Sequence, residues 1–209
     1  MTTVEPVEIQ VSESLVLRGE TATAGHDWVV LVHDLGEDLD GWHILRTSLL
    51  RQGLSVLAFD LRGHGGSDGK ADLADIPADI AAALRHVHAL GAERVFLGAS
   101  GAAAAVAIAL ADATGVDAVF LLAPRAGRVA LSRALTKLVI VAREDDEQQR
   151  TAADLRDAAG WTVVVHVSGK ASGLELLRGV WSSHVIGYVE TFLTDVRRTS
   201  VSSRPSVRG

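Results

Sequence analysis

A serine surrounded by small residues stands between an apolar run and an alanine-rich run. Val95-Phe96-Leu97 precede Gly98, and Ser100 is followed by Gly101, Ala102 and the segment 103–111. This order predicts a strand, a very tight turn and a helix, with Ser100 at the apex of the turn and small residues where strand and helix pass closely. Such a turn holds a hydroxyl above a helix N-terminus, which is how a nucleophilic serine is presented.

The segments around this turn alternate between strand and helix patterns. Continuous apolar runs are typical of strands buried on both faces, and apolar stripes at helical spacing lie between them. We therefore expect an α/β fold, with a mostly parallel central sheet, helices on both faces and a site at the carboxyl ends of the strands. The expected strands are 28–33, 54–59, 95–97, 118–122, 138–142 and 162–167 after a hairpin at 7–11 and 15–18, and the expected helices lie near 42–49, 76–87, 103–111, 147–159 and 185–196.

Length and composition bound the organisation. A chain of 209 residues with 48% hydrophobic residues can bury one core, so we expect a single domain over 1–198. Residues 199–209 have no periodicity and are expected to form a disordered tail. The connection from Pro124 to Thr136 is short, which predicts an open site with no cap domain.

Charge and residue usage exclude several function classes. The formal net charge is −6 and the pI is near 5.7, so nucleic acid is not an expected partner. There is no cysteine, no metal-ligand motif and no phosphate-binding loop, so we expect neither a metal nor a cofactor. No segment is apolar enough for a membrane span, so we expect no membrane partner and a cytoplasmic location. The expected partner is a small molecule, and the oligomeric state stays open.

Three stretches resemble the α/β-hydrolase family, specifically its small lidless serine esterases. Leu31–Gly36 followed by Trp42 is similar to the oxyanion loop and the first helix. Phe59–Gly69 is similar to the loop after the next strand, and it is the most specific of the three. Gly98–Ala102 resembles the nucleophile elbow.

The resemblance assigns roles to particular residues. It implies that Ser100 is the nucleophile and that the backbone N–H groups of Leu35 and Gly101 form the oxyanion hole. The acid is expected just after the strand 138–142, where Asp145 has the family's spacing and Asp146 is the alternative. Both aspartates also suit an N-cap of the helix that follows.

The chain departs from the family pattern at the histidine and in the oxyanion loop. Ser172 stands where the catalytic histidine is expected, and a serine hydroxyl cannot act as a base near neutral pH. Asp34 follows the loop histidine, where the family usually has glycine, and its carboxylate would lie beside a developing oxyanion.

Other histidines are candidates for the missing base. His184, near the start of the last helix, is the substitute that we assign, although it also suits a helix flank. His33 and His64 lie in loops and are expected to hold backbone carbonyls, and His166 is expected to lie on the sheet.

Two hypotheses follow. The first is a serine hydrolase of small carboxylic esters or thioesters that uses Ser100, Asp145 and His184, and the elbow pattern favours it. The second is a hydrolase fold that has lost turnover and binds a small molecule or a partner, and Ser172 and Asp34 favour it. Because one fold can host either function, the site has to decide.

Overall fold

Eight strands form one sheet in the computed structural model, which describes residues 3–125 and 135–202. The strand order is β1-β2-β4-β3-β5-β6-β7-β8, and β4 to β8 run parallel to β3 while β1 and β2 pair antiparallel at one edge. The mostly parallel sheet predicted from the sequence is confirmed. The strands are β1 Glu5–Ser12, β2 Leu15–Ala22, β3 Asp27–Val32, β4 Ser55–Phe59, β5 Arg94–Ser100, β6 Ala118–Leu122, β7 Thr136–Ala142 and β8 Thr162–Val167.

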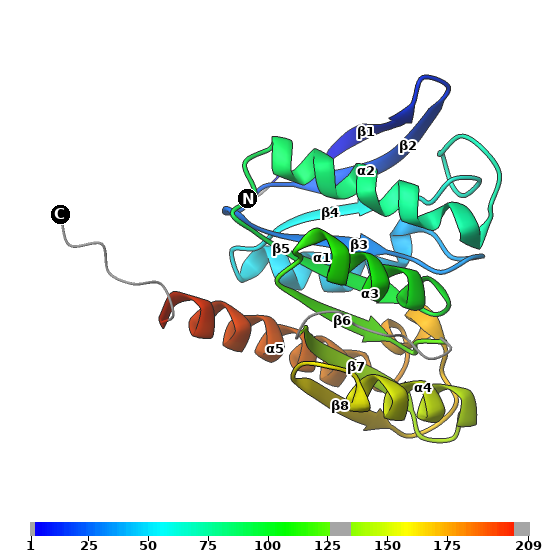
Figure 1. Cartoon of the computed structure of the whole chain (residues 1–209), viewed down its shortest axis with the longest axis vertical. Helices are drawn as coiled ribbons and strands as arrows, with labels where there is room; N and C mark the ends of the chain where they lie inside the picture. The colour runs from blue at the N-terminus through cyan, green and yellow to red at the C-terminus, as the bar shows by residue number, and fades with distance from the viewer. Residues whose placement is uncertain (1–2, 126–134, 203–209) are drawn as a thin grey trace.

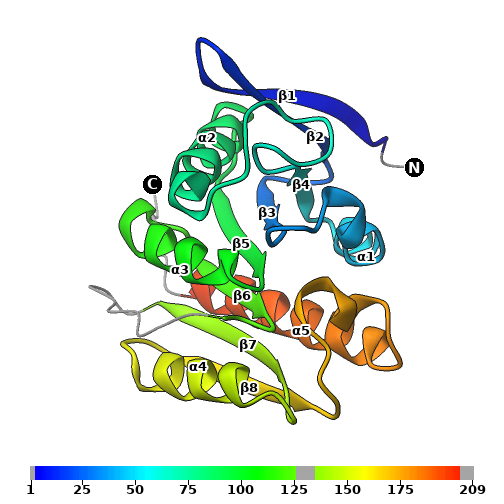
Figure 2. The same cartoon turned by 90° about the vertical axis from the view of Figure 1, so that its right-hand side faces the viewer.

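Helices cover both faces of this sheet (Figures 1 and 2). One apolar core lies between the sheet and α2, α3 and α4, and a second lies between the sheet and α1 and α5. The helices are α1 His43–Arg51, α2 Ile76–Ala89, α3 Ala103–Thr114, α4 Asp146–Asp157 and α5 Ser182–Ser202, with short 3-10 turns η1 Leu39–Trp42, η2 Leu73–Asp75 and η3 Gly173–Leu177. None of the helices within 3–125 and 135–202 is long and apolar enough to span a membrane.

The central strands show why their sequences read as unbroken apolar runs. Every residue of β3, β4 and β6 is buried, because helices cover both sides of these strands. Parallel pairing places the last residues of β3, β5 and β6 at one edge, with Ser100 opposite Leu122 and Ala99 opposite Val32. The loops that follow these strands therefore meet at that edge and form the candidate site.

The predicted boundaries need one correction. Helix α5 extends to Ser202, four residues into the segment that was expected to be a tail, because the helix continues without a breaker past Thr199. The rest of that segment, 203–209, and most of the predicted lidless connection, 126–134, lie outside the described residues.

Ion pairs at the opposite edge fix α5 against the sheet. The buried Asp27, at the start of β3, accepts hydrogen bonds from Arg94 of β5 and from Arg197 of α5 at 2.5–2.8 Å. The Arg94 guanidinium also donates to the Arg197 carbonyl at 2.9 Å, so two strands and the last helix share one polar cluster. A carboxylate removed from water keeps its charge when guanidinium groups satisfy its oxygens in this way.

A buried lysine fixes the neighbouring turn. Lys137 of β7 is fully buried, and its ammonium donates to the carbonyls of Leu135 at 3.0 Å and Ala159 at 2.7 Å. Burial lowers the pKa of Lys137, because the charged form is disfavoured away from water. The two carbonyls keep the chain before β7 next to the chain before β8.

We expect the stability that Lys137 contributes to rise with pH. Its pKa in the folded protein is below the ordinary 10.5, so in the window between the two values the unfolded chain binds more protons, and unfolding becomes less favourable as pH rises. Urea unfolding at pH 7 to 10 should therefore show the wild type gaining stability relative to Lys137→Met. Lys170→Met, at an exposed position, is the control, and an equal gain against both variants would contradict the prediction.

Candidate functional site

The turn between β5 and α3 has its apex one residue later than the sequence predicted. Ser100 is the last residue of β5, and Gly101 has the left-handed backbone, with φ 55°. Ser100 is not among the residues with positive φ, so the apex predicted at Ser100 lies at Gly101 instead. A glycine takes this conformation without the steric cost that a side chain would add. The family places its nucleophile on that strained apex, and here the apex has no side chain.

The carboxylate of Asp34 fills the space at the apex. A β-carbon built on Gly101 would lie 1.8 Å from Asp34 Oδ2, so even alanine does not fit unless Asp34 moves. Asp34 Oδ1 accepts a hydrogen bond at 3.2 Å from the N–H of Ala103, the first residue of α3. A helix N-terminus attracts negative charge, and here the carboxylate of Asp34 supplies that charge to α3.

Ser100 is held by a second carboxylate. Its side chain is fully buried, and its Oγ donates to Glu37 Oε2 at 2.6 Å. The same Glu37 oxygen accepts the N–H of Asp34 at 2.9 Å, in a turn closed by the hydrogen bond from the Glu37 N–H to the Asp34 carbonyl. The hydroxyl thus donates its hydrogen bond to a carboxylate, and Ser100 has no imidazole partner among the described residues.

The other oxygen of Glu37 reaches the loop where a histidine was expected. Glu37 Oε1 accepts the N–H of Leu174 at 2.7 Å. Ser172 precedes this turn, and its N–H donates to Glu175 at 3.0 Å, as in a capping box. The Glu37 carboxylate therefore lies between Ser100 and the loop that carries Ser172.

His33 and His64 are held by backbone groups, as the sequence predicted. His33 is fully buried; its Nδ1 lies 2.7 Å from the Asp34 carbonyl and its Nε2 accepts the Leu61 N–H at 3.0 Å. These partners require the neutral ring with the proton on Nδ1. Burial is the largest cause that lowers the pKa of His33. His64 Nδ1 is 3.0 Å from the Arg62 carbonyl.

Asp145 caps helix α4. Its side chain accepts the N–H groups of Glu147 and Gln148, each at 3.1 Å, and pairs with Arg125 at 3.0 Å. Burial alone would raise the pKa of Asp145, but the Gln148 N–H, the Arg125 charge and the Glu147 N–H outweigh it and hold that pKa below its usual value. Asp146 is the first residue of α4 and is exposed. Among the described residues, neither aspartate contacts a histidine.

The remaining predicted site residues are not brought together with Ser100. His184 is exposed on α5 and packs against Trp181, with the ring centroids 5.6 Å apart. The Gly101 N–H, expected in the oxyanion hole, donates instead to the Leu122 carbonyl at 3.1 Å. The Leu35 N–H makes no hydrogen bond within the described part of the chain, and Leu35 is partly exposed. The described residues also contain no cluster of three potential metal ligands.

Glu37 is the residue that sequence reasoning missed. It lies in the loop that resembles an oxyanion loop, but its distance in sequence from Ser100 and Leu174 gives no signal of contact. Ala123, beside the elbow, is the one non-glycine residue with positive φ in the described chain, at 47°. Backbone strain is therefore present next to the site, at the end of β6.

A comparison with family models decides the family. The model described as serine aminopeptidase, S33, matches residues 24–144, which is more than half of the chain. The chain belongs to this family. The match ends at Glu144, so the part of the S33 model that matches does not extend to Asp145, Ser172 or His184. A search of curated proteins finds no match.

Solved structures share the fold of this S33 member. DcsB, solved with its substrate analogue, has a TM-score of 0.80 at 12% identity, covering 92% of this chain and 99% of DcsB. An esterase of Pyrococcus furiosus has a TM-score of 0.75 at 18% identity, with 93% and 91% covered. An α/β serine hydrolase homologue of Coxiella burnetii has a TM-score of 0.71 at 19% identity, with 88% and 98% covered. The architecture is the α/β-hydrolase fold.

We expect Asp34 and Gly101 to be energetically coupled. Gly101→Ala places a β-carbon against the Asp34 carboxylate at positive φ, so it should cost more than the ~1–2 kcal/mol of the left-handed backbone alone. In an Asp34→Gly background the penalty should fall by about 1 kcal/mol or more, measured by urea unfolding of the four proteins.

Gly115→Ala is the matched control for this cycle. Gly115 has φ 75° and open space around a β-carbon, so its variant carries the backbone cost without a clash. Equal penalties for Gly101→Ala with and without Asp34 would mean that the carboxylate does not fill the apex.

Acid should weaken the fold through His33. The pKa of His33 is below the ordinary 6.5 in the folded protein, so as pH falls through 6.5 the unfolded chain takes up the proton first and stability is lost. Chemical unfolding at pH 7, 6 and 5 should show a decline that is smaller in His33→Gln. His88→Gln, at an exposed position on α2, should keep the wild-type decline. If His33→Gln loses as much stability on acidification as the wild type does, the loss would have to come from other titratable groups.

Proposed function

We propose that this S33 member binds a small molecule reversibly at the carboxyl ends of its strands and forms no acyl-enzyme on Ser100. One observation carries the proposal: the Asp34 carboxylate lies where the β-carbon of an apical nucleophile would be, 1.8 Å from the position built on Gly101. The space at the apex of the elbow is thus occupied by a side chain of the same protein.

The chemistry of acyl transfer supports this proposal. Acyl transfer needs a nucleophile with a base within hydrogen-bond reach and N–H donors aimed at the oxyanion. Ser100 is fully buried and donates a hydrogen bond to Glu37, which also accepts hydrogen bonds from two backbone N–H groups. The Ser100 hydroxyl is therefore engaged with a carboxylate, and no imidazole is hydrogen-bonded to it in the described chain.

The charges at the site favour a particular class of ligand. The Asp34 carboxylate accepts an N–H at the N-terminus of α3, and the Glu37 carboxylate accepts the Asp34 N–H, so a carboxylate or a tetrahedral anion would meet like charges there. We infer that the ligand is neutral or cationic.

The second candidate is a serine hydrolase of small carboxylic esters, cytoplasmic, using Ser100, Asp145 and His184. Family membership supports it, and two of the similar structures are named as an esterase and a serine hydrolase homologue. It requires Ser100 to leave Glu37, and His184 or another base to approach.

The two candidates predict opposite outcomes for labelling and rescue. We expect a fluorophosphonate probe, which traps activated serines, to leave Ser100 unlabelled, as judged by mass spectrometry with a labelled esterase as positive control. Ser172→His should not raise the hydrolysis of a panel of activated short-chain esters, because the apex would still lack a nucleophile. Ser67→Ala is the serine control, since Ser67 Oγ donates to the Asp60 carbonyl outside the elbow.

The contrary result is equally clear. Labelling of Ser100, or ester hydrolysis that is lost in Ser100→Ala and kept in Ser67→Ala, would overturn the binding proposal and establish the hydrolase. A gain in Ser172→His that Ser100→Ala abolishes would do the same, and would identify Ser100 as a nucleophile that lacks only its base.

A further inference from the structure

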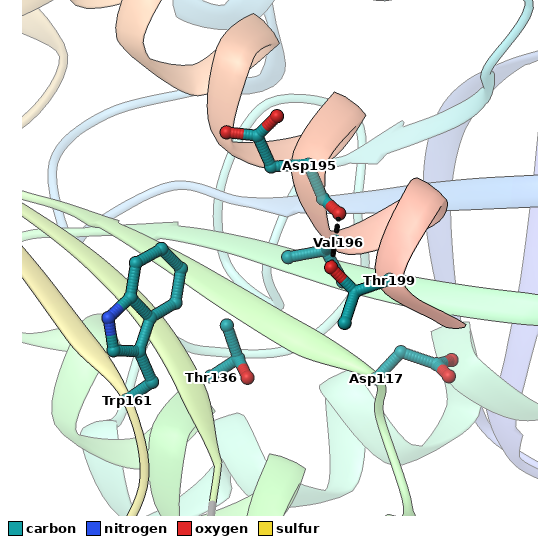
Figure 3. A pocket seen from close by; sticks show the side chains of 6 residues that line it. All are labelled: Asp117, Thr136, Trp161, Asp195, Val196 and Thr199. Carbon is teal, nitrogen blue, oxygen red and sulfur yellow. Dashed lines mark hydrogen bonds between the residues drawn. The ribbon is translucent and has the colours of Figure 1, made fainter. Parts of the chain in front are cut away.

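A second cavity lies at the opposite edge of the sheet, where β6, β7 and β8 begin. Its volume is about 430 Å³, within the range of small-molecule sites. Figure 3 shows Trp161, Thr136, Val196 and Thr199 around it, from the strand ends and from α5, with the carboxylates of Asp117 and Asp195 pointing away from the indole. Among the described residues it is lined by Asp117, Thr136, Trp161, Asp195, Val196 and Thr199.

Trp161 is the unusual member of this lining. Its side chain is 57% exposed, whereas Trp28 and Trp42 are buried in the two cores. The indole nitrogen of Trp161 makes no hydrogen bond within residues 3–125 and 135–202, while that of Trp181 donates to the Ser168 carbonyl at 3.0 Å. Exposing an indole to water forgoes the large gain from burying it, so an aromatic face beside a cavity suggests a ligand surface.

The backbone under Trp161 is rigid. The Trp161 carbonyl accepts the Lys137 N–H at 2.8 Å, and the Lys137 ammonium holds the Ala159 carbonyl two residues earlier. Gly160 has φ 100°, and a β-carbon there would lie 2.2 Å from the Leu135 carbonyl oxygen, so the turn packs directly on the chain before β7. An aromatic ring on such a turn is preorganised for binding.

Among the described residues, the charged side chains that line this cavity are acidic. Asp117 and Asp195 contribute two carboxylates, and the Asp195 carboxylate makes no ion pair or hydrogen bond in the described chain. Asp117 accepts the Val95 N–H at 2.9 Å, which fixes its orientation. The arginines of this edge, Arg94, Arg197 and Arg198, line a different cavity beside α5, and two of them pair with Asp27.

We propose that this cavity binds a small organic ammonium ion, with the cation against the face of Trp161 and the nearby carboxylates of Asp195 and Asp117 giving the surroundings a negative potential. Indole is the best aromatic partner for a cation, and the attraction is strongest where water is partly excluded. The two carboxylates attract a cationic ligand, whereas a neutral apolar ligand gains nothing from their charge. The threonines and Val196 offer short side chains that leave room for alkyl groups on the nitrogen. This proposal is independent of the site at the carboxyl ends.

Choline and its neutral isostere 3,3-dimethylbutan-1-ol test the proposal directly. They have the same shape and differ only in the charge at the quaternary atom. We expect choline to change the tryptophan fluorescence saturably, with a Kd on the order of 1 mM, and the alcohol to bind at least about tenfold more weakly. Isothermal titration calorimetry on the full chain gives the same constants without relying on fluorescence.

Four variants separate the contributions. Trp161→Leu should weaken choline binding by about tenfold and Asp195→Asn by about threefold, whereas Trp161→Phe should keep part of the affinity because a ring remains. Glu13→Gln, which removes one exposed charge in the turn between β1 and β2, should leave the Kd unchanged. Trp161 and Asp195 are exposed, so these variants should fold normally.

An ammonium group occurs both as a free molecule and as a lipid headgroup, so the same variants are tested with phosphatidylcholine vesicles. Choline binding without co-sedimentation assigns a free ligand, and co-sedimentation that Trp161→Leu abolishes assigns the headgroup. Equal affinities for choline and its isostere, or choline binding that survives Trp161→Leu, would overturn the proposal. So would the absence of any saturable signal.

Discussion

The carboxylate of Glu37 is the interaction on which the candidate site depends. It accepts the Ser100 hydroxyl, the Asp34 N–H and the Leu174 N–H, and so joins the loop after β3 to the end of β5 and to the turn η3. The three partners come from different parts of the chain. Without Glu37, each would be a polar group near the core that lacks this hydrogen bond. One carboxylate therefore fixes three segments and at the same time holds the Ser100 hydroxyl in a hydrogen bond.

Asp34 completes this arrangement through electrostatics. A helix N-terminus at the end of a parallel strand attracts anions, and members of this fold use that property to stabilise negative oxygen during acyl transfer. Here Asp34 Oδ1 accepts the Ala103 N–H, and its other oxygen lies over the empty apex at Gly101. The N-terminus of α3 therefore has a carboxylate of the same chain, that of Asp34, as its hydrogen-bond acceptor. The hydrogen bond from the Ala103 N–H to Asp34 is thus a stabilising contact of the folded chain.

The opposite edge of the sheet is organised by buried charge. Asp27 with Arg94 and Arg197 fixes α5, and the Lys137 ammonium fixes the turn that carries Trp161. Residues of the last turns of α5 line both a cavity with arginines and a second cavity with aspartates and an exposed indole. The two edges of one sheet therefore present different chemistry: two carboxylates turned inward at the carboxyl ends, and an accessible aromatic surface at the amino ends.

The sequence by itself determined the architecture, because apolar runs such as those of β3 and β6 and the helical stripes between them reflect burial that any arrangement of this chain has to satisfy. It also indicated the resemblance and the unusual Ser172 and Asp34. It could not determine the apex of the elbow, since Gly101 also has small residues, Ala99 and Ala103, two positions to either side. Only the tertiary structure decided that Gly101 has the positive φ and that Glu37 accepts a hydrogen bond from the Ser100 hydroxyl. The reason is physical: periodicity records which side of an element is buried, whereas a hydrogen bond between residues 63 positions apart depends on where two loops meet in space.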